Sequence, residues 1–172
     1  MQTIEAPEEI FVEARDALPQ MEAGLLWAMR AWAVGLSRGI EVSAEIHAFF
    51  RDIGAPRAAL CLDDVMQRLN EGAARMLEVN CVCHPRVSRD EMDLLLAMAL
   101  HQEGRGHEAQ PVLRRLLEPA HAGRMGEALA RLVAQLNRAG LRMPRRAAAL
   151  EAQVRQGNIL ALAGKAPIQC LH

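Results

Sequence analysis

The 172-residue chain has few aromatic residues: three phenylalanines, two tryptophans and no tyrosine. Residues with β-branched side chains are also sparse, whereas alanine, leucine, methionine, arginine and glutamate are abundant. Aromatic and β-branched residues favour strands, and the abundant residue types favour helices. The composition therefore excludes an extensive β-sheet and predicts an all-α protein.

The chain also lacks a strong net charge of either sign. Its 20 basic and 21 acidic residues give a formal net charge of −1, and the two signs are interspersed along the sequence. A protein that holds a nucleic-acid backbone needs a basic surface, which this composition does not provide. We therefore expect no nucleic-acid partner.

No apolar run is long enough to span a bilayer, which needs about 20 residues. The longest run, from Leu25 to Leu36, is interrupted by Arg30. The first ten residues are acidic and do not contain the apolar core of a secretory signal. We therefore expect a cytoplasmic protein with no membrane segment, in which the four cysteines stay reduced.

Apolar residues recur at helical spacing along most of the chain. Gly39 is expected to end one helix, Ser43 to cap the start of the next, and Ser88 with Glu91 to form a capping box. Pro119 is interpreted as a break between helices. The predicted helices span residues 7–18, 20–38, 43–53, 57–79, 89–103, 107–118, 124–139 and, with the weakest pattern, 145–156.

These helices predict a single-domain all-α bundle of six or seven helices. We expect the bundle to occupy residues 1–156, and residues 157–172 to form a loosely ordered or partner-docked tail. The helices over 20–38 and 89–103 are apolar almost all round, which indicates that they lie at the centre. Their apolar surface exceeds what a lone bundle buries, so we expect a homodimer.

Motifs of several enzyme classes are missing from the sequence. It contains no glycine-rich dinucleotide motif and no P-loop. His107 and Glu108 lack the second histidine of a zinc-protease motif. We predict no catalytic residues, and a non-enzymatic role is the simpler interpretation.

One cluster of soft metal ligands stands out, Cys81-Val82-Cys83-His84-Pro85, between two predicted helices. Thiolate sulfur and imidazole nitrogen suit zinc, and thiolates also suit Cu(I) or an iron–sulfur centre. Pro85 restricts the loop, which lowers the entropy lost when the loop closes around an ion. We therefore predict a metal site, with zinc as the first choice and Cys81, Cys83 and His84 as ligands.

The spacing of these residues leaves the ligand set incomplete. Cys-x-Cys is shorter than the spacing of common zinc sites, and the adjacent Cys83 and His84 can share one ion only with a sharp local backbone. A tetrahedral site also needs further ligands, from a second subunit or from other cysteines and histidines of the chain. These candidates are Cys61, His47, His101, His107, His121, Cys170 and His172.

Two alternatives to metal binding remain open at this point. The cysteines can form a redox-sensing thiol site, because a helix N-terminus with Arg86 and Arg89 nearby favours a thiolate. They can also be small buried apolar residues, with His84 capping the following helix. In that second case, we expect a helical adaptor that binds another protein and carries no metal.

Overall fold

A computed structural model describes residues 13–143, and this part of the chain is all-α, as predicted. Six α-helices pack together, and the strands within this part are only two residues long. The elements are β1 (Glu13–Ala14), the 3-10 turn η1 (Arg15–Ala17), α1 (Gln20–Arg38), α2 (Ser43–Asp52), α3 (Ala58–Gly72), β2 (Arg86–Val87), α4 (Arg89–Gln102), the 3-10 turn η2 (Gly106–Glu108), α5 (Ala109–Leu116) and α6 (Pro119–Arg138).

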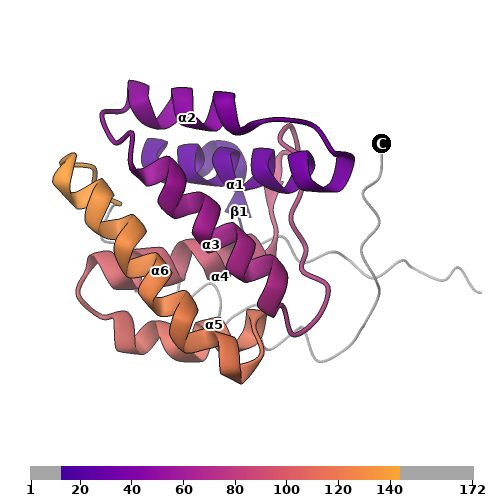
Figure 1. Ribbon diagram of the computed structural model, residues 1–172, viewed down its shortest axis with the longest axis vertical. Helices are drawn as coiled ribbons and strands as arrows, with labels where there is room; N and C mark the ends of the chain where they lie inside the picture. The colour runs from indigo at the N-terminus through magenta and orange to yellow at the C-terminus, as the bar shows by residue number, and fades with distance from the viewer. Residues whose placement is uncertain (1–12, 144–172) are drawn as a thin grey trace, which may run out of the picture.

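Helix α4 is the most deeply buried helix of the described part of the chain. Every residue from Asp90 to Leu100 is buried, because α4 packs against α1, α5 and α6. Helix α3 packs along α6, while α2 lies at one end of the molecule and α5 near the other (Figure 1). Helix α1 buries one side, and its last turn is exposed at Leu36 and Arg38.

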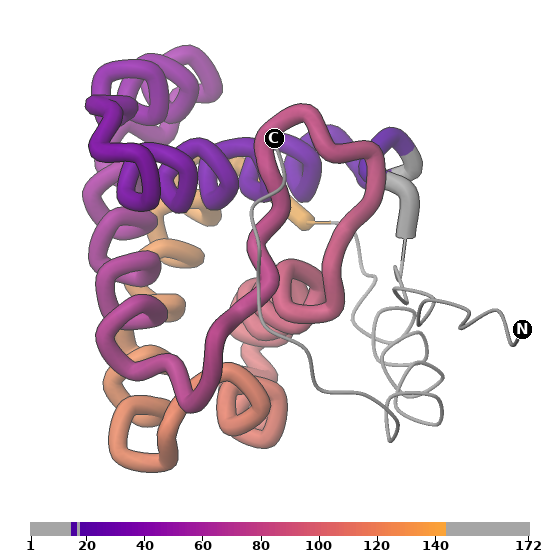
Figure 2. The backbone as a smooth tube through the Cα atoms, turned by 90° about the vertical axis from the view of Figure 1, so that its right-hand side faces the viewer, coloured from indigo at the N-terminus to yellow at the C-terminus, as the bar shows by residue number. Residues whose placement is uncertain are grey.

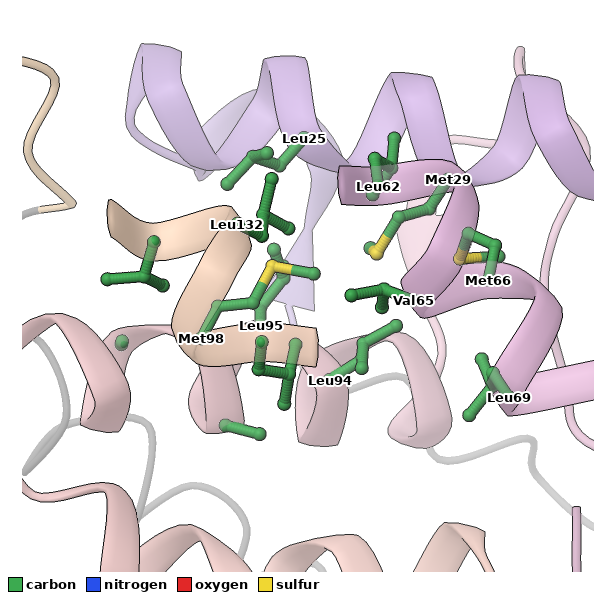
Figure 3. Close-up of a cluster of buried hydrophobic side chains, with 14 of the residues drawn as sticks. Leu25, Met29, Leu62, Val65, Met66, Leu69, Leu94, Leu95, Met98 and Leu132 are labelled. Carbon is green, nitrogen blue, oxygen red and sulfur yellow. The ribbon is translucent and has the colours of Figure 1, made fainter. Parts of the chain in front are cut away.

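The hydrophobic core is formed by side chains from all six helices of the described part of the chain. Its side chains are mostly aliphatic or methionine, as the shortage of aromatic residues requires. Each such side chain stabilises the fold by about 1.5–3 kcal/mol when fully buried. Figure 3 labels Leu25 and Met29 of α1, Leu62, Val65, Met66 and Leu69 of α3, Leu94, Leu95 and Met98 of α4, and Leu132 of α6.

Local sequence signals predicted two helix ends correctly and one wrongly. The capping box forms at α4: Ser88 Oγ accepts from Glu91 N at 3.2 Å, and Ser88 N donates to Glu91 Oε2 at 2.8 Å. Helix α1 ends at Gly39, whose φ of 63° is left-handed. The predicted cap at Ser43 is wrong, because Ser43 is already helical and its N–H and hydroxyl both bind the carboxylate of Glu41.

The helix predicted over 57–79 ends early, at Gly72. A Cβ atom at Gly72 would lie 2.6 Å from the Cβ and Cγ atoms of His121 on α6, so the two helices meet there without room for a side chain. Gly72 O accepts a hydrogen bond from Glu118 N at 2.9 Å, and Ala73 forms an antiparallel bridge with the chain before α6. These tertiary contacts replace the helical hydrogen bonds, so the rest of the predicted helix is not formed.

The helix predicted over 7–18 is wrong where the structure describes it, and residues 7–12 lie outside the described part. Glu13–Ala14 pairs instead with β2 in an antiparallel ladder. Arg15 N donates to Pro85 O at 2.7 Å, which extends this pairing. The backbone hydrogen bonds with residues 85–87, which are distant in the sequence, therefore outweigh the helical spacing of apolar residues in this segment.

The C-terminal helix of the described part starts earlier than predicted. Helix α6 begins at Pro119 rather than at 124, because a proline is well accommodated at the first helical position. The predicted helix over 145–156 and the predicted tail over 157–172 lie outside the described residues. None of the described helices is both long and apolar enough to cross a membrane.

Candidate functional site

The cysteine-rich segment lies in the connection from α3 to α4, over residues 73–88, which contains no helix. Figure 2 shows this connection leaving the end of α3, passing beside α1 and returning to the start of α4. His84 N donates to Cys81 O at 3.0 Å, which closes a four-residue turn. We call residues 78–88, which carry this turn, the dithiol loop.

The turn brings two of the predicted ligands together. Cys81 Sγ and Cys83 Sγ lie 3.6 Å apart, and both cysteines are free thiols. This separation is a non-bonded contact, because the sulfurs of a disulfide lie about 2.05 Å apart. Cys83 is exposed and Cys81 is partly exposed, so the pair is accessible from solvent.

The third predicted ligand, His84, is turned toward the backbone of its own loop. Its Nδ1 lies 3.1 Å from Arg86 O and 3.3 Å from Arg86 N. A metal ion would therefore have to approach the other ring nitrogen, Nε2. Among residues 13–143, no three His, Cys, Asp or Glu side chains form a group that could hold a metal ion. The sharing of one ion by His84 and the two sulfurs stays a prediction.

The other candidate ligands lie on several elements of the fold. Burial raises the pKa of the Cys61 thiol; the charge of Arg131 partly opposes this effect, and the charge of Asp64 adds to it. Cys61 is therefore a poor thiolate at neutral pH. The described candidates are His47 on α2, Cys61 on α3, His101 on α4, His107 in η2 and His121 on α6, whereas Cys170 and His172 lie outside the described residues.

A buried ion pair supports the dithiol loop from the core side. Arg30 of α1 and Glu91 of α4 are both buried, and they form two hydrogen bonds, Nε to Oε1 at 2.8 Å and Nη2 to Oε2 at 2.9 Å. Arg30 also donates to two loop carbonyls, His84 O at 2.8 Å and Arg86 O at 2.6 Å. One guanidinium thereby ties α1, α4 and the dithiol loop together.

The first turn of α4 binds the backbone at both ends of the loop. Glu91 accepts hydrogen bonds from Asn80 N at 2.9 Å and from Ser88 N at 2.8 Å. Asp90 accepts from Glu78 N at 2.7 Å, and Ser88 Oγ donates to Glu78 O at 2.5 Å. Buried backbone groups need partners, and a loop without regular structure cannot supply them by itself. The carboxylates of Asp90 and Glu91 accept hydrogen bonds from these N–H groups and thereby hold the loop backbone in place.

This supporting network was not predicted from the sequence, although the sequence carries one signal of it. Arg30 interrupts the longest apolar run, and Asp90, Glu91 and Asp93 lie at the start of a very apolar helix. A charged side chain on a buried face requires a partner of opposite charge. The pattern therefore indicates buried ion pairs, but it does not identify partners that are 61 residues apart, as Arg30 and Glu91 are.

A cation lies beside the turn that carries the two sulfurs. Arg15 Nη1 donates to the carbonyl of Val82, the residue between the cysteines, at 3.3 Å, and Arg15 Nε contacts Asp16 at 3.1 Å. Arg15 and Val82 also line a hollow of about 360 Å³ together with Trp27 and Arg30 of α1. The positive charge of Arg15 partly offsets the negative charge that thiolates would place on the turn.

Comparisons with known proteins give no further guide to this site. No protein-family model, no curated protein and no solved structure matches the chain. The geometry and chemistry of the dithiol loop therefore carry the functional argument.

Proposed function

We propose that this protein is a non-enzymatic metal-binding protein, and that its dithiol loop captures a thiophilic metal ion, in the first place zinc. The observation that carries the proposal is the 3.6 Å separation of Cys81 Sγ and Cys83 Sγ. Zinc–sulfur bonds are about 2.3 Å long, so sulfurs at this separation subtend an angle of about 100° at the metal. That angle is close to the tetrahedral value, so the two sulfurs fit one edge of a zinc site.

The support beneath the loop favours this function. Arg30 and Glu91 hold the backbone on the core side of the turn, so little conformational freedom is lost when an ion binds. The exposure of Cys83 gives the ion access from solvent. A reducing cytoplasm, where we place the protein, would keep both thiols available.

Among the metals, Cu(I) is our second choice and an iron–sulfur centre the third. Thiolates are soft ligands that bind Cu(I) well. Iron–sulfur clusters are commonly held by four cysteines, and the dithiol loop has two. Zinc comes first because its tetrahedral geometry fits the 3.6 Å sulfur separation without any change in the loop.

The proposal is tested by titrating reduced, tag-free protein with zinc against a chromophoric chelator. We expect saturable binding, and a loss of affinity of more than about 100-fold in Cys81→Ser and in Cys83→Ser. Cys61→Ser is the matched control, because it removes a thiol on α3 outside the loop, and its zinc affinity should equal that of the wild type. Wild-type protein without zinc affinity would contradict the proposal and favour a helical adaptor.

The contact between the sulfurs also favours a second candidate function, redox sensing. Hydrogen peroxide would accept two electrons from the two thiols, an S–S bond would form between Cys81 and Cys83, and the peroxide would leave as two water molecules. We expect a mass decrease of about two units, located in the peptide that contains both cysteines. A peroxide-treated protein in which both thiols still react with an alkylating reagent would contradict this function.

A further inference from the structure

We infer that the dithiol loop is one half of a metal site and that a second copy of this chain supplies the other half. This inference rests on the proposed function, because it assigns the remaining ligands of the same ion. The complete site would hold one zinc ion between four thiolates, Cys81 and Cys83 of each copy. A two-fold axis through the ion would relate the two chains.

The geometry of the ligands is the first support for this inference. Structural zinc sites take four ligands, and sites of four cysteines are common among them. The loop offers two sulfurs spaced for one edge of a tetrahedron, at 3.6 Å. A two-fold axis can convert one edge of a tetrahedron into the opposite edge. Two identical dithiol loops therefore generate a complete tetrahedral ligand set.

The surface position of the turn is the second support. Cys83, Pro85 and Arg86 are all exposed, so the sulfur pair lies at an accessible edge of the molecule. A two-fold contact uses the same patch on both chains, and here each patch would bring the same two ligands. The loop does not have to unfold to present them, because Arg30 holds its backbone from the opposite side.

The charges near the turn are the third support. Four thiolates and one Zn²⁺ ion carry a net charge of −2, which is unfavourable beside acidic groups. Arg15 binds the carbonyl of Val82, between the two cysteines, although it also contacts Asp16. Each copy thus brings the Arg15 guanidinium to the region where the negative charge would lie.

The experiment combines sedimentation, elemental analysis and zinc X-ray absorption on the reduced, tag-free full-length chain. We expect one zinc per two chains in a dimer, a monomer after treatment with a chelator, and four sulfur ligands at about 2.3 Å from the zinc. One zinc per monomer, or a ligand shell that contains nitrogen or oxygen, would overturn this inference and leave the proposed function intact. Absence of zinc binding would overturn both.

Variants identify which residues complete the site. Cys83→Ser should abolish the zinc-dependent dimer, and urea unfolding shows whether the variant is folded. Cys61→Ser should keep the dimer. The double variant Cys170→Ser/His172→Ala should also keep one zinc per two chains, because the second copy provides the missing ligands. Loss of zinc from this double variant would assign those ligands to the C-terminal residues and overturn the inference.

Discussion

The helical core and the dithiol loop are stabilised by different forces. The core is held by mostly aliphatic and methionine side chains from the six described helices. Their burial is favourable in many arrangements because the hydrophobic effect has no direction. The loop buries Val87 in this core, but its path is held by directional hydrogen bonds: Arg30 donates to two loop carbonyls, and Asp90 and Glu91 accept from loop N–H groups. Loss of one partner in such a network leaves the others buried and unsatisfied.

This difference explains how an irregular segment can present a defined site. A loop held mainly by apolar contacts could shift along the core while most of its apolar surface stayed buried. The loop carbonyls of His84 and Arg86 instead meet one guanidinium, which has a fixed planar geometry. Cys81 and Cys83 are therefore fixed through the backbone, and their side chains need no buried contacts of their own.

We expect the largest effect from Arg30→Met, which removes the support of the loop and keeps a long side chain in α1. The buried carboxylate of Glu91 would lose its counter-charge, and two loop carbonyls would lose the hydrogen bonds that Arg30 donates to them. The free energy of unfolding should fall by about 3–5 kcal/mol. Urea unfolding measures this change, and hydrogen exchange should show faster exchange in residues 78–88.

The double variant Arg30→Met/Glu91→Gln is the control for this prediction. It replaces the ion pair by two neutral side chains, so no uncompensated charge stays buried. It should be more stable than Arg30→Met alone, because a buried unpaired charge is the main cost of the single change. A loss below about 1 kcal/mol in the single variant would show that the ion pair does not hold the loop.

We expect a loss of about 2–5 kcal/mol from Leu95→Ala, at a fully buried position of α4. This change leaves the network under the loop intact, so folded protein should keep its zinc affinity while its free energy of unfolding falls. Leu60→Ala is the matched control on the exposed side of α3 and should change stability by less than about 0.5 kcal/mol. A loss of zinc affinity in Leu95→Ala would contradict the separation of core and loop.

We expect the smallest effect on the free energy of unfolding from Asp64→Asn, which removes a carboxylate that pairs with two arginines at the surface. Burial raises the pKa of Asp64, but hydrogen bonds from Arg131 and Arg68 outweigh this effect, so the pKa lies below its ordinary value. Their nitrogens lie 2.7 Å and 2.8 Å from the carboxylate oxygens. Because the pair is partly exposed, Asp64→Asn should cost about 1 kcal/mol or less at pH 7.

The pH dependence of this variant follows from the sign of the pKa shift. A carboxylate whose pKa is lowered on folding stabilises the protein above its unfolded pKa, and this contribution is lost as the pH falls through the folded value. The stability difference between wild type and Asp64→Asn should therefore shrink below about pH 4. Urea unfolding at several pH values measures it, and a difference that grows on acidification would contradict the assignment.

The quality of the sequence predictions follows the same division between core and loop. The helices over 20–38 and 89–103 were predicted well, because an apolar period, a glycine end and a capping box are all local signals. The helix over 57–79 was predicted too long, because its end depends on contacts of Gly72 with His121 and Glu118, which are adjacent in the fold but distant in the sequence. Of the predicted ligands, the structure brings together the two sulfurs of Cys81 and Cys83.

The sequence by itself determined the all-α class, most of the helices and the two cysteines that can meet in one turn, because each of these depends on residues close together in the chain. Only the tertiary structure decided that Arg30 and Glu91 form one buried pair beneath the dithiol loop. It also decided that residues 73–79 leave the helix. These features depend on hydrogen bonds and charges between distant segments, and local patterns do not specify which distant groups will meet.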